Sequence, residues 1–252
     1  MPASNKNYLH GFTLVEMAVV LVIVALIIGG LMMPLSAQVD QQRYNETTRD
    51  LEDAKEALLG YAMSHKAVVD GRPYLPCPDT DNNGVEEVRN GVGVCPSQEG
   101  RLPWTTLGLN RGDAWGNLIR YRVHFNFSNS QNGITLSPVA SVADFRICES
   151  SACAVVIATR VPVVLVSHGK NGYGAISEQL TVNAVPAGIS ADEMENIDGR
   201  NNPTAGNANV DTADTADVDF VSTFSSANFD DVVTWLSPNI LFNRMVAAGQ
   251  LP

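Results

Sequence analysis

The feature that most constrains this chain is a run of uncharged residues near its N terminus. From Met17 to Leu35 no residue is charged, and almost all are aliphatic. A stretch of about 20 such residues is long enough for one helical crossing of a bilayer. Glu16 stands immediately before the run, where a carboxylate costs about 2.5–3.5 kcal/mol or more in a membrane interior. Glu16 therefore predicts a function, and that function requires a partner for the carboxylate.

The segment before the run does not have the order of a secretory signal peptide. A signal peptide has a basic start, then an apolar stretch, then a cleavage site of small residues. Here a short polar segment with a single lysine, Lys6, precedes the only obvious small-residue junction, Gly11–Phe12. Cleavage at this junction would leave the apolar run on the mature protein, which would begin at Phe12.

The string G-F-T-L-V-E at residues 11–16, followed by the apolar run, resembles the N terminus of type IV pilins and type II secretion pseudopilins. The resemblance implies that a prepilin peptidase cuts after Gly11 and methylates the new N terminus, making Phe12 N-methylphenylalanine. It also implies that Glu16 is the assembly glutamate of the family. The expected fold class is α+β and pilin-like, with a long N-terminal helix, membrane-embedded in its first half, packed on an antiparallel β-sheet head.

A physical argument supports the assembly role of Glu16. Cleavage exposes an α-amino group on Phe12, which is positively charged below a pKa of about 8. In a helical stack, Glu16 of one subunit can meet this ammonium group on its neighbour, and two opposite charges buried together offset each other. Two alternatives remain open. In the first, the segment is a plain signal anchor whose glutamate reaches the lipid headgroups. In the second, Glu16 is a buried proton-relay carboxylate.

A polar helix continues the apolar one. After Val39 the residues turn polar, but apolar side chains still recur at steps of three and four, which predicts a single helix from about Phe12 to His65. Its packing face is predicted to contain Tyr44, Thr48, Leu51, Ala54, Leu58, Tyr61 and Ala62. The predicted division of the chain is a prepilin leader at 1–11, a transmembrane and assembly helix at 12–38, a head-packing half at 39–66 and an extracytoplasmic head at 67–252.

The four cysteines form two near pairs, Cys77 with Cys95 and Cys148 with Cys153. Four cysteines allow three connectivities, and proximity in the sequence favours these two local disulfides if the head lies in an oxidising compartment. The alternative is four free buried thiols.

The loop after the first of these cysteines contains a possible calcium motif. Asp79, Asp81 and Asn83 precede a glycine, as in the first half of a calcium-binding loop. The twelfth position, where that loop needs a glutamate, is Asn90, so a solvated turn is the alternative. The family resemblance suggests a second cation site late in the chain, although no ligand spacing supports it. Its candidate residues are Asp217, Asp219, Asp230 and Asp231.

Apolar alternation predicts a half-buried strand over Ile119–Phe127. The W-G-N-x-x-x-Y pattern at its start partly matches the D-P-W-G-N-P-Y stretch of major type II pseudopilins. Further strands are predicted near Ile134–Ala140, Ala154–Thr159 and Val161–Ser167, with Pro162 favouring an edge position. Residues 198–219 are predicted to be an exposed acidic loop. A last helix is predicted to begin after Ser237 and to stop at Gly249.

The net charge argues against nucleic-acid binding, and the lack of known catalytic motifs argues against catalysis. The net charge is −11, whereas nucleic-acid binding needs clustered Lys and Arg. There is no GxSxG, HExxH or GxxxxGK[ST] pattern, and no cofactor is expected apart from calcium. The chain is therefore interpreted as a non-enzymatic filament subunit of the bacterial inner membrane, single-pass, with its head in the periplasm or outside the cell.

The expected partners are the prepilin peptidase, other pilin or pseudopilin subunits, and the inner-membrane assembly platform. The length of the chain and its insertions at 77–100 and 183–219 suggest a minor subunit. Two other interpretations remain open, a binding module or adhesin at a filament tip and a bitopic envelope protein outside any filament.

Overall fold

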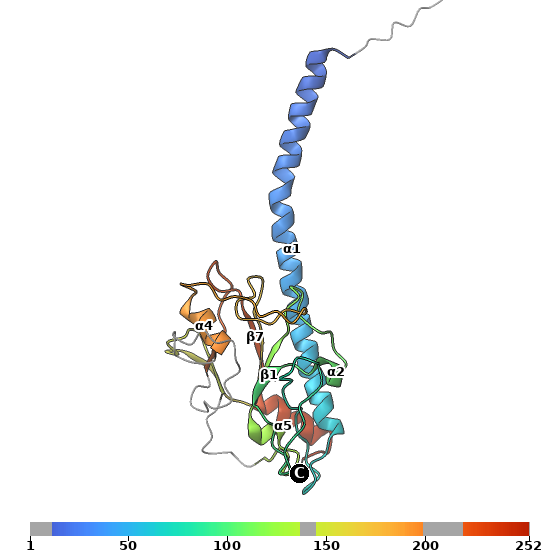
Figure 1. The fold of residues 1–252 in the computed structure, drawn as a ribbon, viewed down its shortest axis with the longest axis vertical. Helices are drawn as coiled ribbons and strands as arrows, with labels where there is room; N and C mark the ends of the chain where they lie inside the picture. Colours follow the sequence, from blue (N-terminus) through green and yellow to red (C-terminus); the bar gives the residue numbers. More distant parts are fainter. Residues whose placement is uncertain (1–11, 137–144, 199–218, 252) are drawn as a thin grey trace, which may run out of the picture. The chain divides into compact units, whose positions relative to one another are not determined.

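The structure, a computed structural model, describes residues 12–136, 145–198 and 219–251, without the side chains of residues 30–35. The chain divides into two compact units, Met1–Gln42 and Arg43–Pro252. Helix α1, Leu14–Ser64, passes from the first unit into the second, and its ends lie within two residues of the predicted helix (Figure 1). The second unit is called the head below.

Within the head, one face of α1 supplies part of the core. Leu51, Ala54, Leu58 and Ala62 are buried at the predicted helical spacing, whereas Tyr44 and Thr48 are exposed. The packing face is therefore confirmed from Leu51 onward.

Seven strands form two sheets in the described ranges of the chain. The first sheet has the order β1-β2-β5-β7 and is antiparallel throughout. Its strands are β1 (Glu99–Arg101), β2 (Arg120–Val123), β5 (Val163–Ser167) and β7 (Val232–Leu236). The second sheet has the order β4-β3-β6, with β3 antiparallel to β4 and parallel to β6. Its strands are β3 (Phe145–Cys148), β4 (Val156–Val161) and β6 (Asp219–Val221).

Successive side chains of a strand point to opposite sides, so the first sheet presents two faces. Both faces are covered. On one face, Tyr121, Leu165 and Leu236 belong to the same core cluster as the buried face of α1. On the other face, Val164 and Val166 pack against Phe145 and Phe220 of the second sheet. The head therefore has three layers: helix, first sheet and second sheet.

Four shorter helices complete the described part of the head. They are α2 (Trp104–Leu107), α3 (Phe125–Ser128), α4 (Ala191–Asp198) and α5 (Pro238–Ala247). The prediction of α5 is confirmed, since Pro238 is its first residue and Ser237 holds the N-cap position. Gly249 follows its end with a φ of 65°, a left-handed conformation that favours glycine.

The predicted strand Ile119–Phe127 is wrong at its end and on its polar side. Strand β2 stops at Val123, and the His124 ring accepts a hydrogen bond from the Asn126 amide, which caps α3. Arg120 and Arg122 are buried, because the second sheet covers the face that was expected to meet solvent. Burial, assisted by the charge of Arg122, also lowers the pKa of His124 to about 4.

Pro162 does not mark an edge strand. It lies between β4 and β5, where the chain passes from the second sheet to the first, and β5 is paired on both sides. The proline therefore removes no amide from the ladder of β5. The strand predicted at Ala154–Thr159 begins and ends two residues later, as β4. The strand predicted at Ile134–Ala140 is irregular at residues 134–136, and its remainder lies outside the described residues, as does most of the acidic loop.

Candidate functional site

The start of α1 is closed by a reciprocal pair of polar side chains. The Thr13 amide and hydroxyl both donate to Glu16 Oε2, over 2.7 and 2.9 Å, and the Glu16 amide donates to Thr13 Oγ1 over 3.3 Å. This is the arrangement of a capping box, in which a threonine and a glutamate three residues later satisfy amides that have no partner within the helix. The T-x-x-E spacing in the sequence contains this signal, which the sequence analysis missed.

The apolar side chains at the start of α1 are exposed in the described part of the chain. Phe12 and Leu14 are 85% and 87% exposed, and large aliphatic side chains remain exposed as far as Ile28. A helix that is apolar on all sides is suited to burial against lipid or other helices. None of the helices in the described ranges has a stretch long and apolar enough to cross a membrane. Gly11, the predicted cleavage position, lies outside the described residues.

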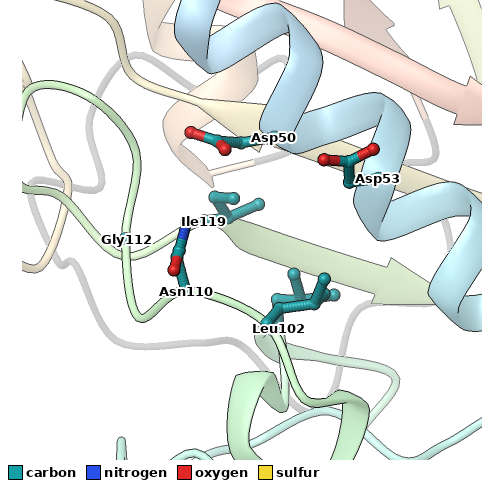
Figure 2. Close-up of a pocket in the computed structure, with 7 residues that line it drawn as sticks. Asp50, Asp53, Leu102, Asn110, Gly112 and Ile119 are labelled. Atoms are coloured by element: carbon teal, nitrogen blue, oxygen red, sulfur yellow. The ribbon is translucent and has the colours of Figure 1, made fainter.

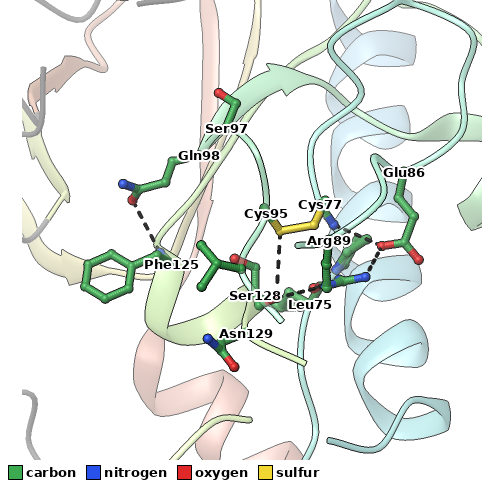
Figure 3. Close-up of a disulfide and its surroundings, with 12 residues drawn as sticks. Leu75, Cys77, Glu86, Arg89, Cys95, Ser97, Gln98, Phe125, Ser128 and Asn129 are labelled. Atoms are coloured by element: carbon green, nitrogen blue, oxygen red, sulfur yellow. Dashed lines mark hydrogen bonds and ion pairs between the residues drawn. A yellow bond between two sulfur atoms is a disulfide. The ribbon is translucent and has the colours of Figure 1, made fainter. Parts of the chain in front are cut away.

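A polar network joins the last turns of α1 to the loop between Cys77 and Cys95. Figure 3 shows the part of this network around Arg89, next to Glu86 and Ser128. Tyr61 donates to Glu86 over 2.5 Å, and Arg89 forms a 2.8 Å ion pair with the same carboxylate. The Arg89 guanidinium also donates to the carbonyls of Leu75 and Ser128, over 2.9 and 3.2 Å. One arginine therefore connects the loop to two other segments of the head.

Both disulfides join the cysteines that are near in sequence, Cys77 with Cys95 and Cys148 with Cys153, and no described cysteine is free. The first closes the loop that contains the predicted calcium residues, and the second closes the turn between β3 and β4. Both lie in the head, where they restrict loops rather than the helix.

The predicted calcium loop is organised by its own amides. Asp79 accepts hydrogen bonds from the backbone amides of Asn82, Asn83 and Gly84, over 2.8, 3.3 and 2.7 Å. Carboxylate oxygens of Asp79, Asp81 and Glu87 lie within 4.8 Å of one another, so Glu87 joins the two predicted aspartates. Calcium binding here stays a prediction.

The late acidic residues are divided between two places. Asp219 pairs with Arg146 over 2.6 Å, whereas Asp230 and Asp231 meet Glu193 of α4, with carboxylate oxygens within 4.8 Å. Burial, together with the charges of Asp231 and Asp230, raises the pKa of Glu193 to about 7. Nothing in the sequence spacing indicated Glu193, because α4 is remote in sequence from both aspartates. Asp217 lies outside the described residues.

The partial pseudopilin-like motif forms a turn centred on Asp113. Asp113 Oδ1 accepts hydrogen bonds from the backbone amides of Trp115 and Asn117, each over 2.9 Å. Asp113 Oδ2 accepts a hydrogen bond from the Ser167 hydroxyl over 2.6 Å. The neighbouring Ala114 amide donates to Thr47 of α1 over 3.2 Å. The motif therefore fastens the first sheet to the helix.

A small acidic hollow lies between α1 and the segments that flank β1 and β2 (Figure 2). Its volume is about 40 Å³, which suits water or a single small ion rather than an organic ligand. The lining residues are Asp50, Asp53, Leu102, Leu109, Asn110, Gly112 and Ile119. Burial and the charges of Glu46 and Asp53 raise the pKa of Asp50.

The adjacent Ser167 and His168 do not form a nucleophile–base pair. The Ser167 hydroxyl donates to Asp113, and His168 Nδ1 instead lies 3.5 Å from Asp231. Both residues are buried.

A comparison with protein families matches the N-terminal segment. Residues 6–32 match the family described as the prokaryotic N-terminal methylation motif. This motif is the signature of type IV pilins and pseudopilins, and the chain carries it together with an α+β fold of pilin-like arrangement. Neither the curated proteins nor the solved structures yield a significant match to the chain.

Proposed function

We propose that this protein is a minor subunit of a type IV pilus or of a type II secretion filament. The observation that carries the proposal is the methylation motif at residues 6–32, together with the exposed apolar side chains of the described residues from Phe12 to Ile28. On this proposal, prepilin peptidase cuts after Gly11 and methylates Phe12. Neighbouring subunits then bury one another's apolar segments.

Membrane insertion before assembly is part of the proposal. It rests on the uncharged run from Met17 to Leu35 and on the pilin motif. The two disulfides fit a head in an oxidising compartment, on the outer side of the bacterial inner membrane. The leader would remain on the cytoplasmic side, where the inner-membrane assembly platform receives the subunit.

Glu16 is assigned the role of setting the axial position of each subunit. In the single chain its carboxylate accepts two hydrogen bonds from Thr13. Transfer of Glu16 to the Phe12 ammonium of a neighbour would replace these bonds with a charge pair in an apolar surrounding. Such a pair offsets two charges that are each costly when buried alone.

The first experiment is mass spectrometry of the intact protein and its N-terminal peptide, taken from native membranes with and without the prepilin peptidase. A chain that begins at Phe12 with one added methyl group supports the proposal. A chain that keeps residues 1–11 in the presence of the peptidase contradicts it and leaves a bitopic envelope protein.

The second experiment separates assembly from membrane anchoring. We expect Glu16→Ala to abolish recovery of the subunit in sheared filaments, while the amount in the membrane stays the same. Glu46→Ala, an exposed acidic position on α1 within the head, is the matched control and should assemble normally. Equal assembly of the two variants would remove the role given to Glu16.

A further inference from the structure

The outer strand of the second sheet has an unusually apolar and uncovered edge. Strand β4 is paired with β3 alone in the described sheet. Val155, Val156 and Ile157 are 54%, 40% and 48% exposed. Because successive residues of a strand face opposite sides, both faces of β4 meet solvent at this point.

This edge lacks the charged residues and prolines that commonly protect an edge strand against pairing with another chain. Residues 152–159 carry no charge and no proline. The pairing of β4 with β3 shifts register twice, once between Val156 and Ala158 and once between Ala158 and Val161, and Arg160 has a φ of 57°. The uncharged apolar stretch at the edge extends from about Ala154 to Ala158, and the first register shift lies within it.

The edge is also held in position before any partner arrives. The Cys148–Cys153 disulfide closes the turn that leads into β4, and the Glu149 amide donates to the Val155 carbonyl over 3.0 Å. A strand that is already ordered loses less conformational entropy on binding than a flexible one.

We propose that this edge is a self-pairing surface, on which a second copy of the chain adds its own β4 in the antiparallel direction. The product is a continuous six-stranded sheet in the order β6-β3-β4-β4-β3-β6, related by a two-fold axis. Main-chain hydrogen bonds supply the contact, and the valine and isoleucine side chains pack across it.

The charges at the two ends of the edge select this occupant and this direction. Arg160 and Glu149 are the first charged residues on either side of the uncharged stretch, and both are exposed. Antiparallel pairing brings Arg160 of each copy toward the turn that carries Glu149 of the other. Parallel pairing would instead place the two arginines side by side, and like charges directly opposite are destabilising.

The test uses the full chain in detergent micelles and measures its mass by light scattering over a range of concentrations. We expect a dimer whose association constant falls at least about tenfold in Val156→Lys, because an edge lysine blocks strand pairing. Val88→Lys is the control, since Val88 is 87% exposed and lies on the loop between Cys77 and Cys95 rather than on β4. This control should dimerise as the wild type does.

Hydrogen exchange on the same samples identifies the interface. Amides of residues 154–158 should gain protection as the protein concentration rises, and the gain should be lost in Val156→Lys. If that variant unfolds at a lower temperature than the wild type, Ile157→Lys, on the opposite face of the strand, replaces it. Two results would overturn the proposal. The first is a chain that stays monomeric, and the second is a dimer that the β4 variants leave unchanged, because such a dimer forms through α1.

Discussion

The phenol of Tyr61 in α1 donates a hydrogen bond to the carboxylate of Glu86, on the loop closed by Cys77 and Cys95. Burial, followed by the interaction with Glu86, raises the pKa of Tyr61, so the phenol stays protonated and remains a donor at neutral pH. The long helix and an insertion of the head are therefore joined by a partly buried, charge-assisted hydrogen bond.

Removal of this donor should weaken the head. We expect Tyr61→Phe to lower the free energy of unfolding by about 1.5–3 kcal/mol, the usual range for a hydrogen bond to a charged group. Urea denaturation of the full chain in detergent provides the measurement. Tyr44→Phe is the control, because Tyr44 lies on the exposed side of the same helix. Equal losses in the two variants would show that the Tyr61 hydroxyl contributes nothing specific.

The two disulfides should contribute unequally to stability. The Cys77–Cys95 bond closes a loop with a sequence separation of 18, and the Cys148–Cys153 bond closes one of 5. In the chain-entropy model, the disulfide that closes the longer loop stabilises the folded state by about 3 kcal/mol. The disulfide that closes the shorter loop stabilises it by about 2 kcal/mol. We therefore expect the serine double variant of the first pair to show the lower denaturation midpoint. The reverse order would contradict the model for this head.

The stability of the head should fall as pH rises from about 4.5 to about 7. The pKa of Glu193 is raised from 4.5 to about 7 in the folded chain, so the folded state holds the proton more tightly than the unfolded state. Stability is therefore greatest below the unfolded pKa and is lost as pH rises through the folded value. Thermal unfolding at a series of pH values, with a chelator present, measures this dependence.

The variant Glu193→Gln tests whether this residue is the source of the pH dependence. It removes the titrating group and should flatten the curve between pH 4.5 and 7. Glu178→Gln is the control, because Glu178 belongs to none of the acidic groups formed by the described residues, and it should keep the wild-type slope. An unchanged slope in Glu193→Gln would assign the effect to another group.

Local patterns predicted the features that depend on neighbouring residues. The family comparison confirmed the methylation motif, which it matches over residues 6–32. The roles of Gly11, Phe12 and Glu16 within the motif stay predictions. Helical spacing predicted the buried face at Leu51 and Leu58, because a helix brings such residues to one side. The existence of α5 followed from its proline and glycine boundary signals.

Features that depend on long-range contacts were missed. The alternation around Arg122 predicted a solvated face, but a second sheet built from β3, β4 and β6 covers it. The meeting of Glu193 with Asp230 joins α4 to the start of β7, segments whose proximity only the tertiary fold creates. Alternation of apolar and polar residues indicates that a strand has two different faces. It does not indicate what covers the second face.

The last prediction concerns Thr13, which caps α1 through the same carboxylate that is assigned to assembly. Thr13→Val removes the hydroxyl that bonds to Glu16 and keeps a side chain of similar size. Loss of an N-cap side chain costs about 0.5–2 kcal/mol, so the first turn should fray, and amides of residues 14–17 should exchange faster in micelles. Filament recovery should fall only modestly, because Glu16 remains available to pair with the Phe12 ammonium of a neighbour. Thr48→Val, at an exposed position in the same helix, is the control and should leave exchange at 14–17 unchanged. If Thr13→Val abolished assembly as completely as Glu16→Ala, the glutamate would act through the cap within its own chain, and the pairing between subunits would be rejected.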